Sequence, residues 1–131
     1  MFRTPYLTVA GLLMLAFGSA SAQSPRAEVI HWWTSGGESA AIQEIATAYR
    51  AAGGTWVDSA IAGGEQARAA AINRIVGGNP STAAQFNTSQ QFTDIVKSGM
   101  LNNVDDVAKK NDWDRLLPAP ILKSIKIDGH F

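Results

Sequence analysis

The stretch from His31 to Glu38 gathers the side chains best suited to hold a small ligand. Two adjacent tryptophans, Trp32 and Trp33, are followed by the glycine pair Gly36-Gly37 and by the carboxylate of Glu38. Aromatic rings offer apolar faces, glycines leave backbone N–H groups accessible, and a carboxylate accepts strong hydrogen bonds. An apolar pair precedes the stretch and an alanine-rich helical pattern follows it, which is typical of a strand-to-helix junction. We interpret it as one lip of a ligand-binding site.

Two further stretches are expected at the same edge of the sheet, namely Ala62-Gly63-Gly64-Glu65 and Gln85-Phe86-Asn87-Thr88. In an open parallel sheet the ligand lies beyond the carboxyl ends of the strands, where such turns converge. The mixture suits a neutral polyhydroxylated ligand such as a sugar, whose C–H face packs on an aromatic ring while carboxylates and amides bind its hydroxyls. The candidate ligand-binding residues are Trp32, Trp33, Glu38, Gln85 and Asn87.

Each candidate also has a purely structural alternative. Successive strand residues face opposite ways, so at least one of Trp32 and Trp33 is expected in the core, with Trp33 favoured as the exposed one. Glu38 could act only on the helix dipole, and Gln85 and Asn87 could only satisfy turn backbone. Three other residues are expected to be packing residues rather than ligand contacts: His31, Trp56 and Trp113.

The hydrophobic periodicity predicts three strand-helix units in an α/β fold, a mostly parallel sheet flanked by helices. Strands are expected at 28–33, 55–61 and 82–86, with helices over 35–52, 65–76 and 92–98 that end at glycines. Ser35 and Glu38 have capping-box spacing, and Ile42, Ile45, Ala46 and Tyr49 form one stripe. Farther on, we expect a short helix at 105–111, a turn between Pro118 and Pro120, a strand at 125–127 and a hairpin turn at Asp128-Gly129.

The first residues have the pattern of a secretory signal peptide, assigned to residues 1–22. An apolar run, Leu7 to Phe17, precedes the small-residue site Ala20-Ser21-Ala22. A membrane anchor is the alternative, but the run is shorter than the ~20 residues that cross a bilayer. Cysteine is absent, so disulfides and thiolate metal sites are excluded. These features favour a bacterial periplasmic location.

Other chemistries find little support. The formal net charge is +0, which gives no footprint for nucleic acid. The two histidines form no zinc pattern, and the glycine pairs match neither a dinucleotide nor a P-loop fingerprint, so no metal or cofactor is expected. Glu38 and Asp58 could be imagined as the carboxylate pair of a secreted glycoside-acting enzyme. No enzymatic activity is our primary expectation, and this enzyme remains the alternative.

Five blocks of the sequence resemble the mature start of the glucose- and mannose-type sugar-binding proteins of bacterial ABC importers (extracellular solute-binding proteins, family 1). They are Val29 to Glu38, Thr55 to Gly64, Gly78-Asn79-Pro80, Ala83-Ala84-Gln85 and Asn103 to Ala108. The resemblance runs in order over almost all of 28–131, and its Trp-Trp-Thr-Ser-Gly-Gly-Glu run is specific.

The resemblance implies a monomeric two-lobed periplasmic receptor (type II) that closes around a monosaccharide and delivers it to the transmembrane subunits of an ABC permease. It implies sugar contacts at Trp33, Glu38 and Gln85, with Trp32 beside them; Asn87 stands where many members have lysine, which bears on the sugar bound. Family chains are longer, so residues 23–131 are expected to be the N-terminal portion of an incomplete first lobe. Weak or no sugar binding by this chain alone is expected, and a fragment without function is a further alternative.

Overall fold

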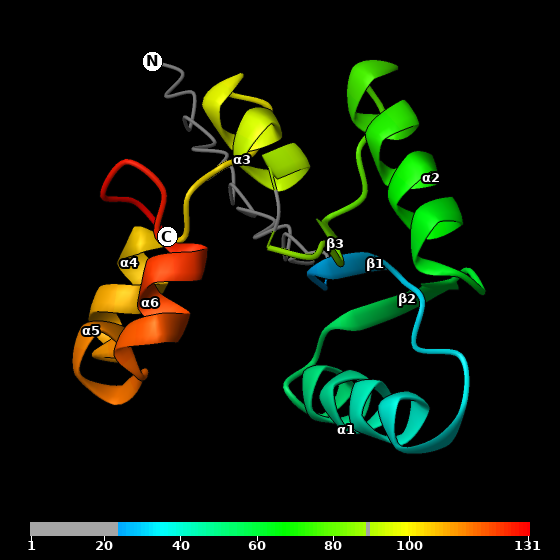
Figure 1. Ribbon diagram of the computed structural model, residues 1–131. Coiled ribbons are helices and arrows are strands. Elements are labelled where there is room, and N and C mark those ends of the chain that lie inside the picture. The colour runs from blue at the N-terminus through cyan, green and yellow to red at the C-terminus, as the bar shows by residue number, and fades with distance from the viewer. Residues whose placement is uncertain (1–23, 89) are drawn as a thin grey trace, which may run out of the picture.

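Three parallel strands form the sheet, in the order β2-β1-β3 (Figure 1). The computed structural model describes residues 24–88 and 90–131, so the signal peptide expected at 1–22 lies outside the described residues. Along the chain the elements are β1 (Arg26–His31), α1 (Gly36–Ala51), β2 (Thr55–Ala60), α2 (Gly64–Val76), β3 (Ala83–Ala84), α3 (Gln90–Lys97), α4 (Asp105–Lys110), α5 (Trp113–Leu116) and α6 (Ala119–Ile125). The α/β fold with a parallel sheet and flanking helices is confirmed. In the described part, no helix has the length and apolar character needed to cross a membrane.

β1 is the central strand. It pairs with β2 along its whole length, from Arg26 opposite Thr55 to His31 opposite Ala60. β3 pairs with β1 only at Ala83 and Ala84, so it is much shorter than the strand expected at 82–86. The carboxyl ends of β1 and β2 therefore lie side by side, which places the segments that follow them at one edge.

The two faces of the sheet are covered by different helices, with α1 and α2 on opposite sides in Figure 1. On the α2 face, Ile30 packs with Ala67 and Ala71, and a ring of half-buried apolar residues surrounds them: Trp32, Ile61, Ala84 and Phe86. On the other face, Ile42 and Ala46 of α1 are buried. Small alanines at these contacts let the helices approach the strands closely.

Glycines end the first three helices, as the sequence predicts. Gly53 has φ +88°, a conformation that a residue with a Cβ rarely adopts, and its N–H donates to the Arg50 carbonyl at 3.0 Å. The N–H of Gly54 reaches the Tyr49 carbonyl at 3.1 Å, which completes a Schellman motif. Gly78 and Gly99, at φ +73° and +72°, occupy the equivalent positions after α2 and α3.

Two details of α1 differ from expectation. Ser35 is the N-cap residue, but its side chain makes no capping hydrogen bond, so the prediction of a capping box with Glu38 is wrong. Gly36, with φ +59°, turns the chain at the start of the helix. Ile45 is 53% exposed although it falls on the predicted stripe, because the narrow sheet covers only the part of α1 that carries Ile42 and Ala46.

The C-terminal region forms a separate group of helices, α4 to α6, to one side of the sheet (Figure 1). The expected turn between Pro118 and Pro120 is wrong, because Pro118 is the N-cap of α6 and Pro120 lies in its first turn, where the missing N–H is tolerated. The expected strand at 125–127 is also wrong: Ile125 ends α6, and Ile127 makes one antiparallel bridge to His130. The turn at Asp128-Gly129 is confirmed, with φ +51° and +90°.

Candidate functional site

The two tryptophans after β1 serve opposite faces of the sheet. Trp32 packs on the apolar cluster beneath α2. A Cβ on Gly64, the first residue of α2, would lie 3.6 Å from the Trp32 indole, so the start of the helix lies close to the ring. Trp33 instead lines a cavity with Ile42 of α1. The alternation of the strand thus continues into the turn and gives the two indoles different surroundings.

Gln85 connects the segment after β3 to the tryptophan turn. Its backbone N–H donates to the Ile30 carbonyl at 2.9 Å, extending the β1-β3 pairing. Its side-chain Oε1 accepts the backbone N–H of Trp32 at 3.2 Å. The structural role considered from the sequence is therefore present, since the amide satisfies a turn N–H, and the same bond holds two of the three expected site segments together.

A cavity of about 220 Å³ lies on the α1 face, between β1, β3 and Ile42 of α1. Its wall is formed by Val29, His31, Trp33, Ile42, Ala83, Ala84 and Gln85. The volume is below the ~300–1,000 Å³ of sites that enclose drug-sized ligands. The arrangement offers one aromatic and several aliphatic surfaces, with a carboxamide at the margin.

The structure brings Trp32, Trp33 and Gln85 together, and of the five candidates only Trp33 and Gln85 line the cavity. Glu38 is exposed in the first turn of α1. Asn87 is exposed in the segment between β3 and α3.

His31 is a core histidine, in agreement with the sequence analysis. It is 2% exposed, and its Nε2 forms a very short contact with Oδ1 of Asp58 in β2. Gln43 of α1 donates from Nε2 to the other oxygen, Asp58 Oδ2, at 2.9 Å. Both carboxylate oxygens of Asp58 are therefore engaged, which disfavours the use of this residue in a glycosidase pair with Glu38.

The link between His31 and Asp58 is not among the contacts predicted from the sequence. A signal was present, because a parallel pairing of the two predicted strands places Val29 opposite Asp58 and His31 two positions farther along the same face. The register of the strands is set by the fold. Residue spacing alone therefore gives this contact as one of several possible contacts and does not single it out.

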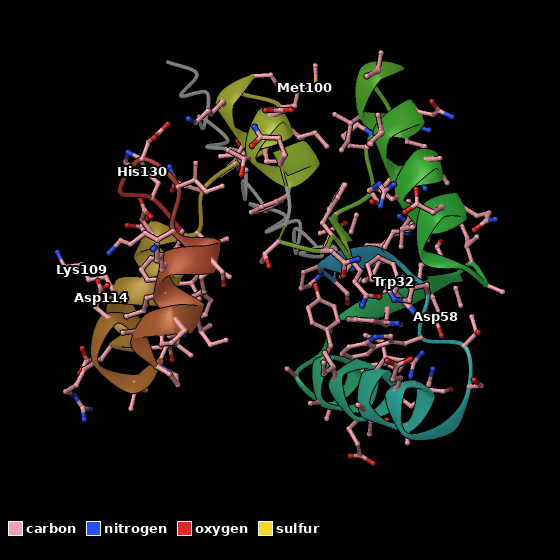
Figure 2. The ribbon with its side chains drawn as sticks, in the orientation of Figure 1. Trp32, Asp58, Met100, Lys109, Asp114 and His130 are labelled. Atoms are coloured by element: carbon pink, nitrogen blue, oxygen red, sulfur yellow. The ribbon has the colours of Figure 1, made fainter. Side chains whose placement is uncertain are left out.

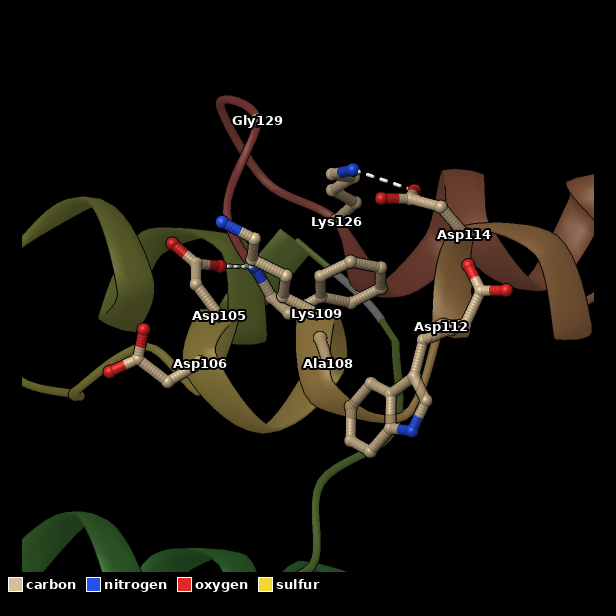
Figure 3. Close-up of a pocket in the computed structure, with 10 residues that line it drawn as sticks. Asp105, Asp106, Ala108, Lys109, Asp112, Asp114, Lys126 and Gly129 are labelled. Atoms are coloured by element: carbon tan, nitrogen blue, oxygen red, sulfur yellow. Dashed lines mark hydrogen bonds and ion pairs between the residues drawn. The ribbon is translucent and has the colours of Figure 1, made fainter.

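A second cavity, of about 320 Å³, lies among α4, α5 and the chain's last residues (Figure 3). Trp113 packs edge-on against Phe131, with ring centroids 5.6 Å apart, which confirms its expected packing role. Lys126 donates to Asp114 at 2.7 Å, and the Phe131 N–H donates to Asp105 at 2.8 Å. These wall residues satisfy one another. In the part of the chain that the structure describes, no cluster of three or more His, Cys, Asp or Glu side chains could hold a metal ion.

Comparison with known proteins identifies relatives with consistent names. The chain is 39% identical over 126 residues to a probable sugar-binding periplasmic protein of Rhizobium meliloti (strain 1021), covering 95% of this chain and 30% of that protein. A protein of the same name from Brucella suis biovar 1 (strain 1330) is 39% identical over 106 residues, covering 79% and 25%. Another, from Mesorhizobium japonicum (strain LMG 29417 / CECT 9101 / MAFF 303099), is 30% identical over 131 residues, covering 98% and 31%.

The chain therefore spans about a third or less of the length of the relatives that it matches. No protein-family model matches it. The relatives are named as periplasmic proteins, which agrees with the location that the sequence predicts for this chain.

Proposed function

We propose that this chain contributes to the capture of a monosaccharide of the glucose or mannose type in the periplasm, as part of the substrate-binding component of an ABC importer. The observation that carries the proposal is that Trp33 and Gln85 line one cavity while Gln85 also binds the Trp32 backbone. The names of the relatives support sugar binding and a periplasmic location. We further propose that residues 23–131 belong to the first of two lobes, in a monomeric receptor whose partners are the permease's transmembrane subunits.

In this proposal Trp33 supplies the apolar surface of the site. A pyranose presents a face of C–H groups, and these pack favourably on an indole ring. Trp32 holds the turn in place from the opposite face, because its ring is packed under α2 and its N–H is bound by Gln85.

The polar contacts come from side chains at the rim. Gln85 accepts the Trp32 N–H through Oε1, which leaves its amide N–H₂ able to donate to a sugar oxygen. Glu38, exposed in the first turn of α1, accepts hydrogen bonds from hydroxyl groups as the sugar is captured. Asn87 adds an amide from the segment after β3, and its difference from lysine affects which sugar is preferred.

The central experiment follows the tryptophans by fluorine NMR in the chain labelled with 5-fluorotryptophan, during titration with glucose and with mannose. Of the two outcomes expected from the sequence for this chain alone, weak binding or none, the proposal requires weak binding. The Trp33 resonance, assigned by its loss in Trp33→Phe, should move with sugar in the millimolar range, which corresponds to about 4 kcal/mol of binding. Trp113, which packs in α5 far along the chain, is the internal control and should not move. Equal movement of both resonances, or of neither, contradicts the proposal.

A matched pair of glutamates separates sugar binding from general charge effects. Glu38→Gln is expected to weaken the sugar response about ten-fold, since a charge-assisted bond to a hydroxyl is lost. Glu44→Gln removes a charge from an exposed position farther along the same helix and should leave the response unchanged. Hydrolysis of an aryl glycoside that Glu38→Gln abolishes would instead favour the enzyme alternative.

A further inference from the structure

His31 stands at the base of the proposed sugar site. It ends β1, directly before Trp32, and its side chain is 3% exposed. Among the residues that the structure describes, it is the one polar or charged residue that is buried. An imidazole in such a place is tolerated only if its polar atoms are satisfied or its ring is otherwise needed.

One ring nitrogen belongs to a network that joins three elements. Nε2 of His31 contacts Asp58 in β2, and Gln43 in α1 donates to the same carboxylate. Burial raises the pKa of Asp58, but the hydrogen bonds from His31 and Gln43 and the charges of His31 and Arg50 lower it by more, so the carboxylate stays ionised. His31 ends β1, and Asp58 lies opposite Val29 within β2. Figure 2 labels Asp58 together with Trp32, the residue that follows His31.

The other ring nitrogen has no such role. Nδ1 is buried and has no hydrogen-bond partner among the described residues. The same imidazole forms part of the cavity wall, together with Trp33, Ile42 and Gln85. The ring is thus held by Asp58 through Nε2, and His31 and Trp33, two positions apart in the chain, line the same cavity.

We propose that His31 is a positioning residue of the sugar site: its imidazole, anchored by Asp58 and Gln43, sets the orientation of the Trp33 indole. This inference rests on the proposed function. His31 acts through Trp33 and makes no sugar contact of its own. Asp58 and Gln43 act one step farther away, by keeping the imidazole in a single orientation.

The test uses the 5-fluorotryptophan-labelled chain without sugar. Asp58→Asn keeps the size of the side chain but removes the charge that anchors the imidazole, and the Asp58 side chain is 32% exposed, so the substitution is compatible with folding. We expect the Trp33 resonance to shift or broaden while the Trp113 resonance stays in place. Gln43→Ala, at an exposed position of α1, should move the same Trp33 resonance by a smaller amount.

Trp56→Phe is the matched control. Trp56 lies on the same face of the sheet as His31 and is not part of the cavity wall. Its ring packs edge-on against that of Tyr49, with the ring centroids 6.0 Å apart. It should lower the urea midpoint without moving the Trp33 resonance. A Trp33 resonance that is unchanged in both Asp58→Asn and Gln43→Ala overturns the positioning role.

The sugar titration is a second readout. Asp58→Asn is expected to bind glucose about ten-fold more weakly than the unaltered chain, a change of about 1.4 kcal/mol. Trp56→Phe, which also lowers the urea midpoint, should bind glucose as the unaltered chain does. An unaltered chain that gives no response to glucose contradicts the proposed function only. The sugar-free resonances still decide whether His31 positions Trp33, so the two failures are distinguishable.

Discussion

Arg74 of α2 binds Glu28 of β1 through both ends of its guanidinium group, with Nη1 donating to Oε1 at 2.5 Å and Nη2 donating to Oε2 at 3.1 Å. Ser59 of β2 donates to the same Oε1 at 3.2 Å. The hydrogen bond from Arg74 is the main reason that the pKa of Glu28 falls from 4.5 to about 2, against the opposing effect of burial. One carboxylate thereby links the central strand to a strand and to a helix.

The first prediction concerns acid stability. Because the folded pKa of Glu28 is depressed, its contribution to stability is present above pH 4.5 and is lost as the pH falls toward about 2. Glu28→Gln should lower the urea midpoint at neutral pH and flatten the loss of stability between those two pH values. Asp58 and Asp105, whose pKa values are also lowered, should leave a residual acid dependence. Glu44→Gln is the control, and a Glu28→Gln profile parallel to the unaltered one would contradict the assignment.

The second prediction concerns the bond from Gln85 to the tryptophan turn. Gln85→Ala leaves the half-buried Trp32 N–H without its acceptor, which should destabilise the fold by about 1–3 kcal/mol. Urea denaturation measures the loss, and hydrogen exchange at the Trp32 amide should accelerate. Gln66→Ala, at an exposed position in α2, should do neither. Unaltered exchange at Trp32 in Gln85→Ala would show that the bond does not protect this turn.

The third prediction uses two glycines with opposite surroundings. A Cβ on Gly54 would overlap the Tyr49 ring, which is held between Trp56 and the Pro25 carbonyl. Gly54→Ala should therefore cost about 1–3 kcal/mol of stability, measured by urea denaturation. Gly37→Ala meets open space within α1 and should be stabilising by about 0.5–1 kcal/mol, because alanine favours the helix. The same sign for both variants would refute the steric argument.

The fourth prediction concerns the end of the chain. Asp105 binds His130 Nδ1 at 2.6 Å and the Phe131 N–H at 2.8 Å, and these two bonds, the first above all, hold its pKa below the ordinary value. Asp105→Ala should release Phe131 from Trp113 and change the fluorine resonance of Trp113, with little change in the urea midpoint, since ion pairs near the surface contribute little to stability. Asp106→Ala, at the exposed neighbouring position, should leave Trp113 unchanged.

Local signals in the sequence were sufficient for the first three helices and for the alternation of strands and helices along the chain. The glycines at 53, 78 and 99 adopt positive φ, and that conformational requirement is visible from residue type alone. The elements after α3 are harder to predict from the sequence. Pro120 is as compatible with the first turn of a helix as with a loop, and only the contacts of α6 decide between these two structures.

The candidate site was predictable in part. Strand alternation separates Trp32 from Trp33, and the carboxyl-edge rule brings Gln85 to them. The bond from Gln85 to the Trp32 N–H and the His31-Asp58-Gln43 network depend on register and helix placement, which residue spacing alone does not fix. Glu38 and Asn87 are exposed, and neither is among the residues that line the cavity.

β1 and β3, the strands that lead into the site, differ in how extensively they are paired within the sheet. The tryptophan turn follows β1, which pairs with β2 along its whole length and with β3 at two residues, whereas Gln85 follows β3, which pairs with β1 alone. Such a short pairing is expected to open at a lower free energy than the central strand. A molecule that contacts both Trp33 and Gln85 therefore stabilises the pairing of β3 with β1, which is the shorter of the two strand pairings in the sheet. Binding of such a molecule and the pairing of β3 with β1 are then thermodynamically coupled, so that each favours the other.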